Sequence, residues 1–258
     1  MEKQELKDYF EDIYVNRIGS VSDICESIKC GYNNHNSMYW LEKHFECLGI
    51  IEFCYKKCLK DGRKFFYKST LVREWFYENF HKKEYEVDPS DIAAFTFESL
   101  YYAILSGSID RAVHMAELYG SIEVDEAVHP ASILLGYGLK YTILNNKEKM
   151  LEYAQKLEES KTKRGMKQYA DGEARIFRGL AEYDEEEFNK GLEFMLKHHV
   201  ARMRRNACCL EEHFAYSCIA FAMLAKDRGI NVTVKHELLP DEYFVDSDIN
   251  YNEISIIS

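Results

Sequence analysis

The sequence predicts a mainly α protein in two parts: three helices plus a β-hairpin at the N-terminus, then an all-α array of helical hairpins. Three observations predict this fold class. Apolar residues recur at helical spacing over most of the 258 residues. Glycine occurs 13 times and proline 3 times, too few for a turn-rich all-β architecture. The stretch 50–69 alternates instead with the period of two that is typical of strands.

Composition and charge indicate a globular protein without membrane-spanning segments, divided into two domains. Apolar residues make up 47% of the chain, which is enough for a sizeable core. No apolar run approaches the ~18 residues that span a bilayer, and the first residues lack the pattern of a secretory signal. We therefore expect a cytoplasmic protein with no membrane partner. The net charge of -11 falls entirely in residues 71–258, because residues 1–70 are balanced. This shift predicts two domains, 1–84 and 85–258.

The N-terminal segment carries three apolar stripes at helical spacing. The first predicted helix ends at residues 17–19, and the second opens at Ser20 with a near capping box and stops at Gly31. The third follows a polar turn and ends at Gly49. The stripes comprise Leu6, Phe10 and Ile13; Val21, Ile24, Cys25 and Ile28; and Met38, Leu41, Phe45 and Leu48.

A β-hairpin is predicted over residues 52–68. Two β-prone runs flank Asp61-Gly62, a dipeptide typical of hairpin turns. Three helices followed by a hairpin, with the stretch SVSDICESIKCGYNNHNSMYWLEKHFECLGIIE at their core, resemble the winged helix-turn-helix family over about residues 4–70. The resemblance implies contact with DNA, or protein docking without base readout.

The predicted DNA contacts come from the third helix and the wing. The third helix would contact bases through its N-terminal part, while basic wing residues would hold phosphates. The wing carries a net charge of +4, although edge lysines on a solvated hairpin would give the same pattern. A homodimer would present two such wings to a two-fold site. The predicted contact residues are Asn34, Asn36, Ser37, Tyr39, Lys43, Lys56, Lys57, Lys60, Arg63 and Lys64; His35, Trp40 and His44 also face outward.

The sequence after the predicted boundary indicates a series of consecutive amphipathic helices. Three stretches repeat a helix end, a short polar turn and a new helix, which begins near Asp110, Lys147 and Asp184, about 37 residues apart. This resembles tetratricopeptide hairpins, whose period is ~34, without their Trp, Gly and Pro signature. We therefore expect a helical-hairpin array. The predicted helices are 91–106, 109–119, 130–144, 147–160, 164–181, 184–205 and 209–228.

The last third of the chain carries a more specific pattern. An Ala-rich helix over 220–225 is followed by Arg228-Gly229, an extended stretch over 230–234, and Leu239-Pro240. This order resembles the immunity protein 49 family of polymorphic toxin systems, most clearly over 178–244. The resemblance implies a non-enzymatic all-α protein that neutralises a toxin by binding it. A core stripe of Phe214, Cys218, Phe221 and Ala225 explains most of the helix without that function. The tail 246–258 is either frayed or a pairing strand.

Motifs for catalysis or metal binding are missing from the sequence. There is no phosphate loop, dinucleotide fingerprint, metalloprotease motif or nucleophile elbow. The histidines and glutamates of 198–199 and 211–213 lack metal-ligand spacing, and Cys54 and Cys58 have no second matching pair. We expect reduced cysteines, no metal and no cofactor. The leading hypothesis is a DNA-binding regulator; the alternative is an immunity or defence protein that binds a toxin or another protein.

Overall fold

The computed structural model describes residues 3–31, 35–80, 82, 87, 91–120, 130–160, 164–205, 210–245 and 247–257, which contain helices and no strand. Short π or 3₁₀ turns occur at Glu52–Lys56, Ala94–Phe97, Leu210–His213, Asp241–Phe244 and Tyr251–Glu253. None of the described helices is long and apolar enough to cross a membrane. The α-helices are α1 (Lys3–Lys29), α2 (His35–Ile51), α3 (Leu59–Asn79), α4 (Glu98–Leu105), α5 (Ile109–Leu118), α6 (Pro130–Ile143), α7 (Lys147–Glu159), α8 (Arg164–Glu182), α9 (Glu185–Met203) and α10 (Tyr216–Asp227).

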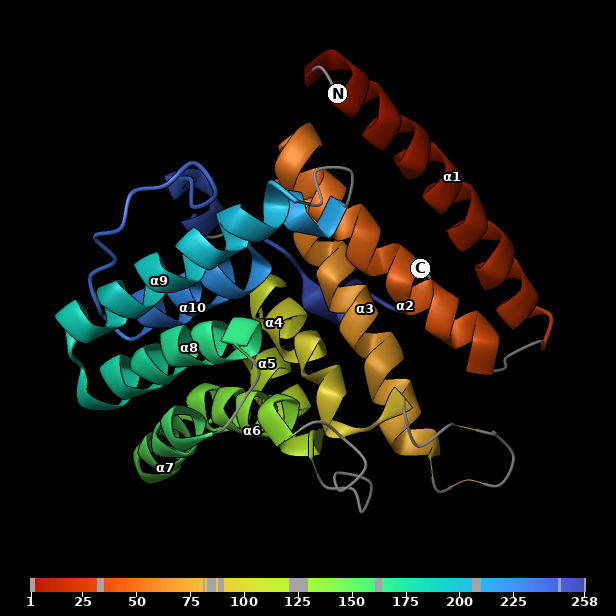
Figure 1. The fold of residues 1–258 in the computed structure, drawn as a ribbon. Helices are drawn as coiled ribbons and strands as arrows, with labels where there is room; N and C mark the ends of the chain where they lie inside the picture. The colour runs from red at the N-terminus through yellow and green to blue at the C-terminus, as the bar shows by residue number, and fades with distance from the viewer. Residues whose placement is uncertain are drawn as a thin grey trace.

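Helices α1, α2 and α3 lie side by side, with α1 outermost and α2 in the middle (Figure 1). The prediction of two helices before Gly31 is wrong, because α1 continues through Gly19 and Ser20. The Ser20 hydroxyl donates to the carbonyl of Asn16 at 3.0 Å, so it bonds back along the helix and does not cap a new one. Gly31 has a φ of +88° and lies just beyond the end of α1, as expected.

The predicted β-hairpin wing is wrong. Residues 52–68 form a π turn and the first half of α3, and the chain reverses between them at Lys57, which has a φ of 58°. Gly62 lies inside α3, where an added Cβ would lie 2.3 Å from the Phe53 ring. Gly49 likewise faces Phe66 across the same contact and does not end α2. These glycines allow two helices to approach closely, and Gly62 is not the corner of a hairpin.

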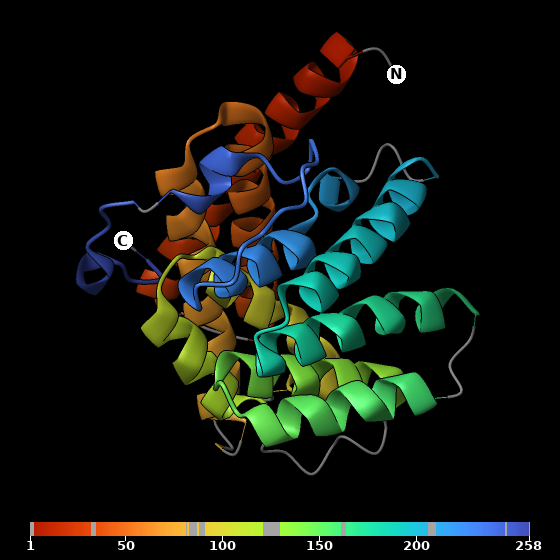
Figure 2. The same ribbon diagram turned by 90° about the vertical axis from the view of Figure 1, so that its left-hand side faces the viewer.

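The helical-hairpin array is confirmed. Helices α4 and α5, α6 and α7, and α8 and α9 form successive antiparallel pairs, and α10 packs against α4 and α9 (Figure 2). The second helix of each pair begins at an N-cap, Ser108, Asn146 or Asp184, whose side chain accepts from the backbone N–H three residues on. The caps lie 38 residues apart, and a residue with positive φ precedes each one.

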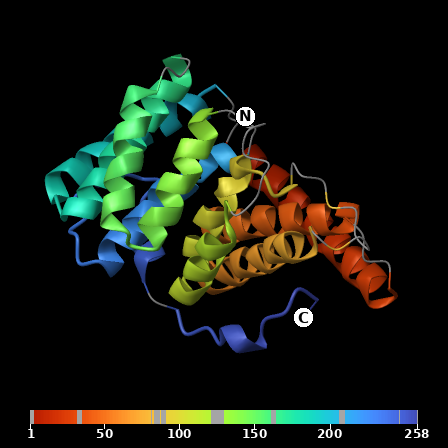
Figure 3. The ribbon, with the colours of Figure 1, turned by 90° about the horizontal axis from the view of Figure 1, so that it is seen from below.

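The chain after α10 crosses from the array to α3 (Figure 3). The extended stretch is held by α9: Asn189 Nδ2 donates to the Asn231 carbonyl at 2.9 Å, and Asn189 Oδ1 accepts from the Thr233 N–H at 2.8 Å. Near the end, the Tyr251 ring lies 4.9 Å from the Tyr67 ring of α3. The described part of the tail is therefore packed on helices and pairs with no strand.

An aromatic cluster joins residues from both sides of the predicted boundary at 84/85. Phe66 of α3 stacks on Tyr102 of α4 at 5.3 Å and on Phe214 at 5.9 Å, and Phe53 lies 5.5 Å from Phe214. Phe53 and Phe66 are fully buried. The division into domains 1–84 and 85–258 stays a prediction, and this cluster provides the test for it.

Candidate protein-binding site

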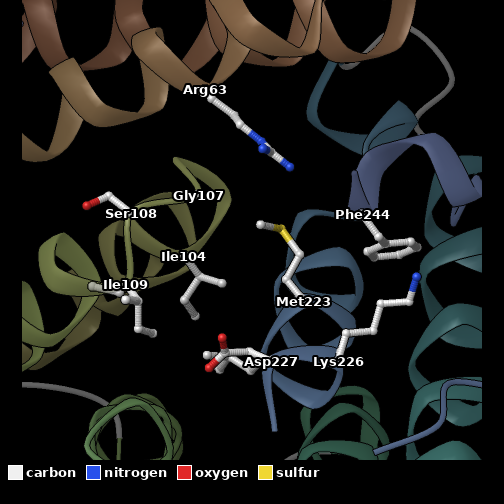
Figure 4. Close-up of a pocket in the computed structure, with 11 residues that line it drawn as sticks. Arg63, Ile104, Gly107, Ser108, Ile109, Met223, Lys226, Asp227 and Phe244 are labelled. Atoms are coloured by element: carbon white, nitrogen blue, oxygen red, sulfur yellow. The ribbon is translucent and has the colours of Figure 1, made fainter. Parts of the chain in front are cut away.

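A cavity of about 320 Å³ lies where α3, the α4–α5 turn, α10 and the C-terminal segment meet (Figure 4). We call it the junction pocket. Its apolar wall combines buried side chains with partly exposed ones, and its rim carries charged groups. The wall includes Ile104, Ile109, Ala112, Met223, Leu224 and Phe244, and the rim includes Arg63, Lys226 and Asp227.

The α4–α5 turn shapes one side of the junction pocket. Gly107 has a φ of +78°, and an added Cβ would lie 3.2 Å from Arg63 Cδ, so glycine allows α3 to approach the turn. Ser108 then caps α5 and fixes where the helix begins. Ile109, the first residue of α5, is consequently held at the pocket with 47% of its surface exposed. A branched apolar side chain in this position is available to a partner.

Helix α10 provides the opposite side. Met223, Lys226 and Asp227 lie one helical turn apart and therefore share a face. Lys226 Nζ lies 4.5 Å from the centre of the Phe244 ring, and Figure 4 shows the lysine pointing toward it. This cation–π contact keeps Phe244 against the pocket. Methionine is flexible, so this wall of the pocket can adapt its shape to what it contacts.

Arg63 holds the C-terminal segment beside the pocket through hydrogen bonds. Its Nη1 donates to Ser247 Oγ at 2.6 Å, and its Nη2 donates to the Val245 carbonyl at 2.8 Å and the Tyr243 carbonyl at 3.3 Å. Arg63 is only 4% exposed. The sequence predicts Arg63 as a phosphate contact, whereas in the structure its Nη1 and Nη2 donate to the chain's own C-terminal segment.

The other predicted wing residues lie around the start of α3 without forming a wing. Lys56 Nζ lies 3.4 Å from the centre of the Tyr14 ring, and Lys64 pairs with Asp61 at 2.9 Å. Lys57 lies over the Tyr243 ring, and Lys60 is exposed. Residues 237–253, which Arg63 holds against this helix, contain six acidic residues and no lysine or arginine. The chain therefore places acidic charge of its own near this basic cluster.

The predicted recognition-helix residues lie on α2, apart from Asn34, which falls outside the described residues. Asn36 is exposed and Ser37 is half-buried at the start of α2. Tyr39 and Lys43 face α1, and Lys43 Nζ pairs with a carboxylate oxygen of Glu46 at 2.8 Å. The structure thus brings Tyr39 and Lys43 together on α2, while the lysines of the predicted wing lie in the π turn, just after it, and in the first turns of α3.

A buried charge network lies between α2 and α3. Arg73 Nε and Nη2 donate to the two oxygens of Glu42 at 2.8 and 2.5 Å, and Arg73 also donates to the Asp91 carbonyl. Burial raises the pKa of nearby Glu46, while Lys43 opposes that shift. The paired charges satisfy one another, so their role is structural.

Metal-binding geometry is not found in the described part of the chain. No three His, Cys, Asp or Glu side chains there lie close enough to hold an ion. His199 is buried in α9, and the His213 ring lies 5.6 Å from the Phe10 ring. The side chains of Glu211 and Glu212 are outside the described set. The cysteines that are described are free thiols.

Comparison with known proteins locates a family within the C-terminal part. Residues 125–243 match the family model of immunity protein 49. The match spans α6 to α10 and the extended segment, and it confirms the resemblance predicted for the C-terminal part. Nothing in the comparison supports a winged helix-turn-helix at the N-terminus. No curated protein and no solved structure matches the chain.

Sequence reasoning missed the junction pocket because it is assembled from four separate stretches. The N-cap pattern marks where α5 begins, so Ile109 could have been recognised as an apolar residue at an exposed helix start. Nothing local to residue 63 or 244 indicates that either lies next to α5. Only the fold brings them together.

Proposed function

We propose that this protein is an immunity or defence protein that acts without catalysis and neutralises a partner protein, such as a toxin, by binding it directly. The observation that carries the proposal is the immunity protein 49 match over residues 125–243. That range contains most of the helical array and the α10 face of the junction pocket. The sequence adds that the common motifs for catalysis are missing.

The junction pocket supports binding of a protein. Interface hot spots combine an apolar centre with a charged or polar rim, and the pocket has both. Exposed Ile109 and adaptable Met223 form the centre, while Lys226 and Asp227 offer charges of both signs. A stable complex buries roughly 1,200–2,000 Å² in total, so the pocket would anchor a wider interface across the neighbouring helices.

The structure removes the main support for the hypothesis of a DNA-binding regulator. The wing that would hold phosphates is replaced by α3, and Arg63 is buried against the C-terminal segment. The chain carries a net charge of -11, which repels nucleic acid. No observation favours DNA binding over protein binding, so only the protein-binding function is proposed.

Affinity purification from a nuclease-treated lysate tests the proposal. We expect one protein to co-purify in stoichiometric amount with the wild type, and to be lost with Ile109→Asp. This change places a carboxylate in the apolar wall, yet an acidic residue at a helix start is compatible with the fold. Lys147→Asp is the matched control, because Lys147 is the first residue of α7 and lies outside the pocket. Equal recovery with both variants, or recovery of nucleic acid in place of protein, would contradict the proposal.

A further inference from the structure

A second concave surface lies between α1 and α2, away from the junction pocket. Its volume is about 370 Å³. We call it the α1–α2 groove. Tyr9, Ile13 and Arg17 line it from α1 at intervals of four residues, so they form one stripe along the helix. Tyr39 and Trp40 line it from α2. Neither helix lies in the range matched by the immunity family, so this surface is independent of the proposed function.

The groove exposes aromatic surface. Trp40 is 52% exposed and Tyr9 is 44% exposed. The Tyr39 and Trp40 rings meet edge to face at 5.5 Å, which holds both in place. Helix α1 is the outermost helix of its layer, beside α2 (Figure 1). Tryptophan, tyrosine and arginine together are the residues most enriched in interface hot spots.

The groove also carries a positive charge. Arg17 Nη1 lies 2.8 Å from His44 Nδ1, and burial together with Arg17 lowers the pKa of His44 to about 4. His44 is therefore neutral at pH 7 and does not add to the charge. Glu46, the carboxylate of the groove, is paired with Lys43. Among the described carboxylates, none forms an ion pair with Arg17, so the groove keeps a net positive charge within an acidic protein.

We propose that the α1–α2 groove binds an amphipathic helix of a partner protein, which covers Trp40 and Tyr9 with apolar side chains and pairs a carboxylate with Arg17. The charge of the groove selects an acidic segment, because a basic one would face Arg17 unpaired. The lining residues run from Tyr9 to Arg17 on α1, which is about 12 Å at 1.5 Å per residue. Two to three turns of a helix match that length, as in other helix-in-groove complexes.

Two matched peptides test the proposal on the full chain. Both are fluorescein-labelled helices of about 14 residues, stapled because free helices of that length are marginal in water. Each carries a stripe of leucines at helical spacing; one has glutamates beside the stripe, and the other has glutamines. We expect the glutamate peptide to bind about fivefold more tightly by fluorescence anisotropy, the factor that corresponds to an exposed ion pair of ~1 kcal/mol.

Two variants locate the binding site. Arg17→Gln should make the two peptides bind equally, and Trp40→Ala should weaken both by about tenfold or more. Both side chains reach solvent, so circular dichroism should confirm that each variant is folded. Binding of neither peptide to the wild type would overturn the proposal. A preference for glutamate that survives Arg17→Gln would also overturn it. Loss of binding at the junction pocket with Ile109→Asp would leave this result unchanged, because the groove uses other residues.

Discussion

Arg63 on α3 donates to the backbone carbonyl of Val245 at 2.8 Å, across 182 residues of sequence. The same guanidinium reaches Ser247 Oγ at 2.6 Å, so one side chain from the N-terminal helices holds the C-terminal segment in place. Phe244, between the two carbonyls that Arg63 contacts, lines the junction pocket. The position of this pocket wall therefore depends on Arg63, a residue that the sequence predicts to contact DNA phosphates.

Removing the Arg63 side chain should destabilise the protein. Arg63→Ala leaves the Val245 and Tyr243 carbonyls without their charged donor, and we expect the free energy of unfolding to fall by about 2–3 kcal/mol. Lys64→Ala, the neighbouring control, removes a surface pair with Asp61 and should cost ~0.5 kcal/mol or less. Urea unfolding measures both. Equal losses of unfolding free energy in the two variants would show that the hydrogen bonds of Arg63 do not stabilise the C-terminal segment.

The buried pair of Arg73 and Glu42 gives a second prediction. Arg73→Ala leaves Glu42 charged and buried without a partner, and should cost about 3–5 kcal/mol of unfolding free energy. Replacing both residues together, with Arg73→Met and Glu42→Leu, should recover much of that loss because no unpaired charge remains. Thermal and urea unfolding of the single and double variants give the comparison. A double variant less stable than the single one would contradict a mainly structural role.

The buried carboxyl group of Glu173 should make the stability of the protein depend on pH. Its carboxyl group is fully buried and accepts a hydrogen bond from Tyr101 Oη at 2.5 Å. Burial raises its pKa from 4.5 to about 8. Between these values the folded chain keeps a proton that the unfolded chain releases, so this group's contribution to stability falls as the pH rises from 4.5 toward 8.

Glu173→Gln should therefore gain stability relative to the wild type as the pH is raised through that window. The amide keeps the shape of the side chain and cannot ionise. Melting temperatures of both proteins across the pH range measure the difference, and the exposed Glu193→Gln is the control that should follow the wild type. A difference between Glu173→Gln and the wild type that stays constant with pH would show that Glu173 is already ionised when buried.

The predicted boundary at 84/85 is tested by a fragment. The charge shift along the chain and Pro89 predict that residues 85–258 stay helical alone. In the structure, α4 to α10 pack mainly on one another. We expect a lower melting temperature than that of the full chain, because Tyr102 and Phe214 lose their contacts with Phe66. Limited proteolysis and circular dichroism of the fragment provide the measurement. A fragment that unfolds would place both segments in one domain.

Local patterns predicted all seven C-terminal helices, and three of them have a polar cap such as Asp184 at their start. The starts of two were wrong: α4 begins at Glu98 and α10 at Tyr216, whereas the predicted helices begin at 91 and 209. The first helix was divided wrongly, because Ser20 bonds equally well inside a helix. The hairpin was wrong for a related reason. Gly62 next to an aspartate is typical of a turn, and only the packing of Phe53 shows that a helix contact requires the glycine.

Binding sites were harder to predict than helices. The sequence marked Tyr39 and Lys43 on the third predicted helix, and both line the α1–α2 groove. The groove also requires Arg17. The sequence pattern places Arg17 at the end of the first predicted helix, whereas in the structure it lies within α1 and lines the groove. The junction pocket depends on four stretches that meet only after folding. Periodicity determines which face of a helix is buried, whereas the neighbour across that face is set by tertiary packing.

We propose that this protein protects a cell by binding a toxic protein at the junction pocket. The direct measurement is the growth of cells that express the partner protein recovered by affinity purification together with the wild type, Ile109→Asp or Lys147→Asp. We predict growth with the wild type and with Lys147→Asp, and growth arrest with Ile109→Asp at equal protein levels. Growth arrest with all three chains, or protection by Ile109→Asp equal to that of the wild type, would contradict the claim.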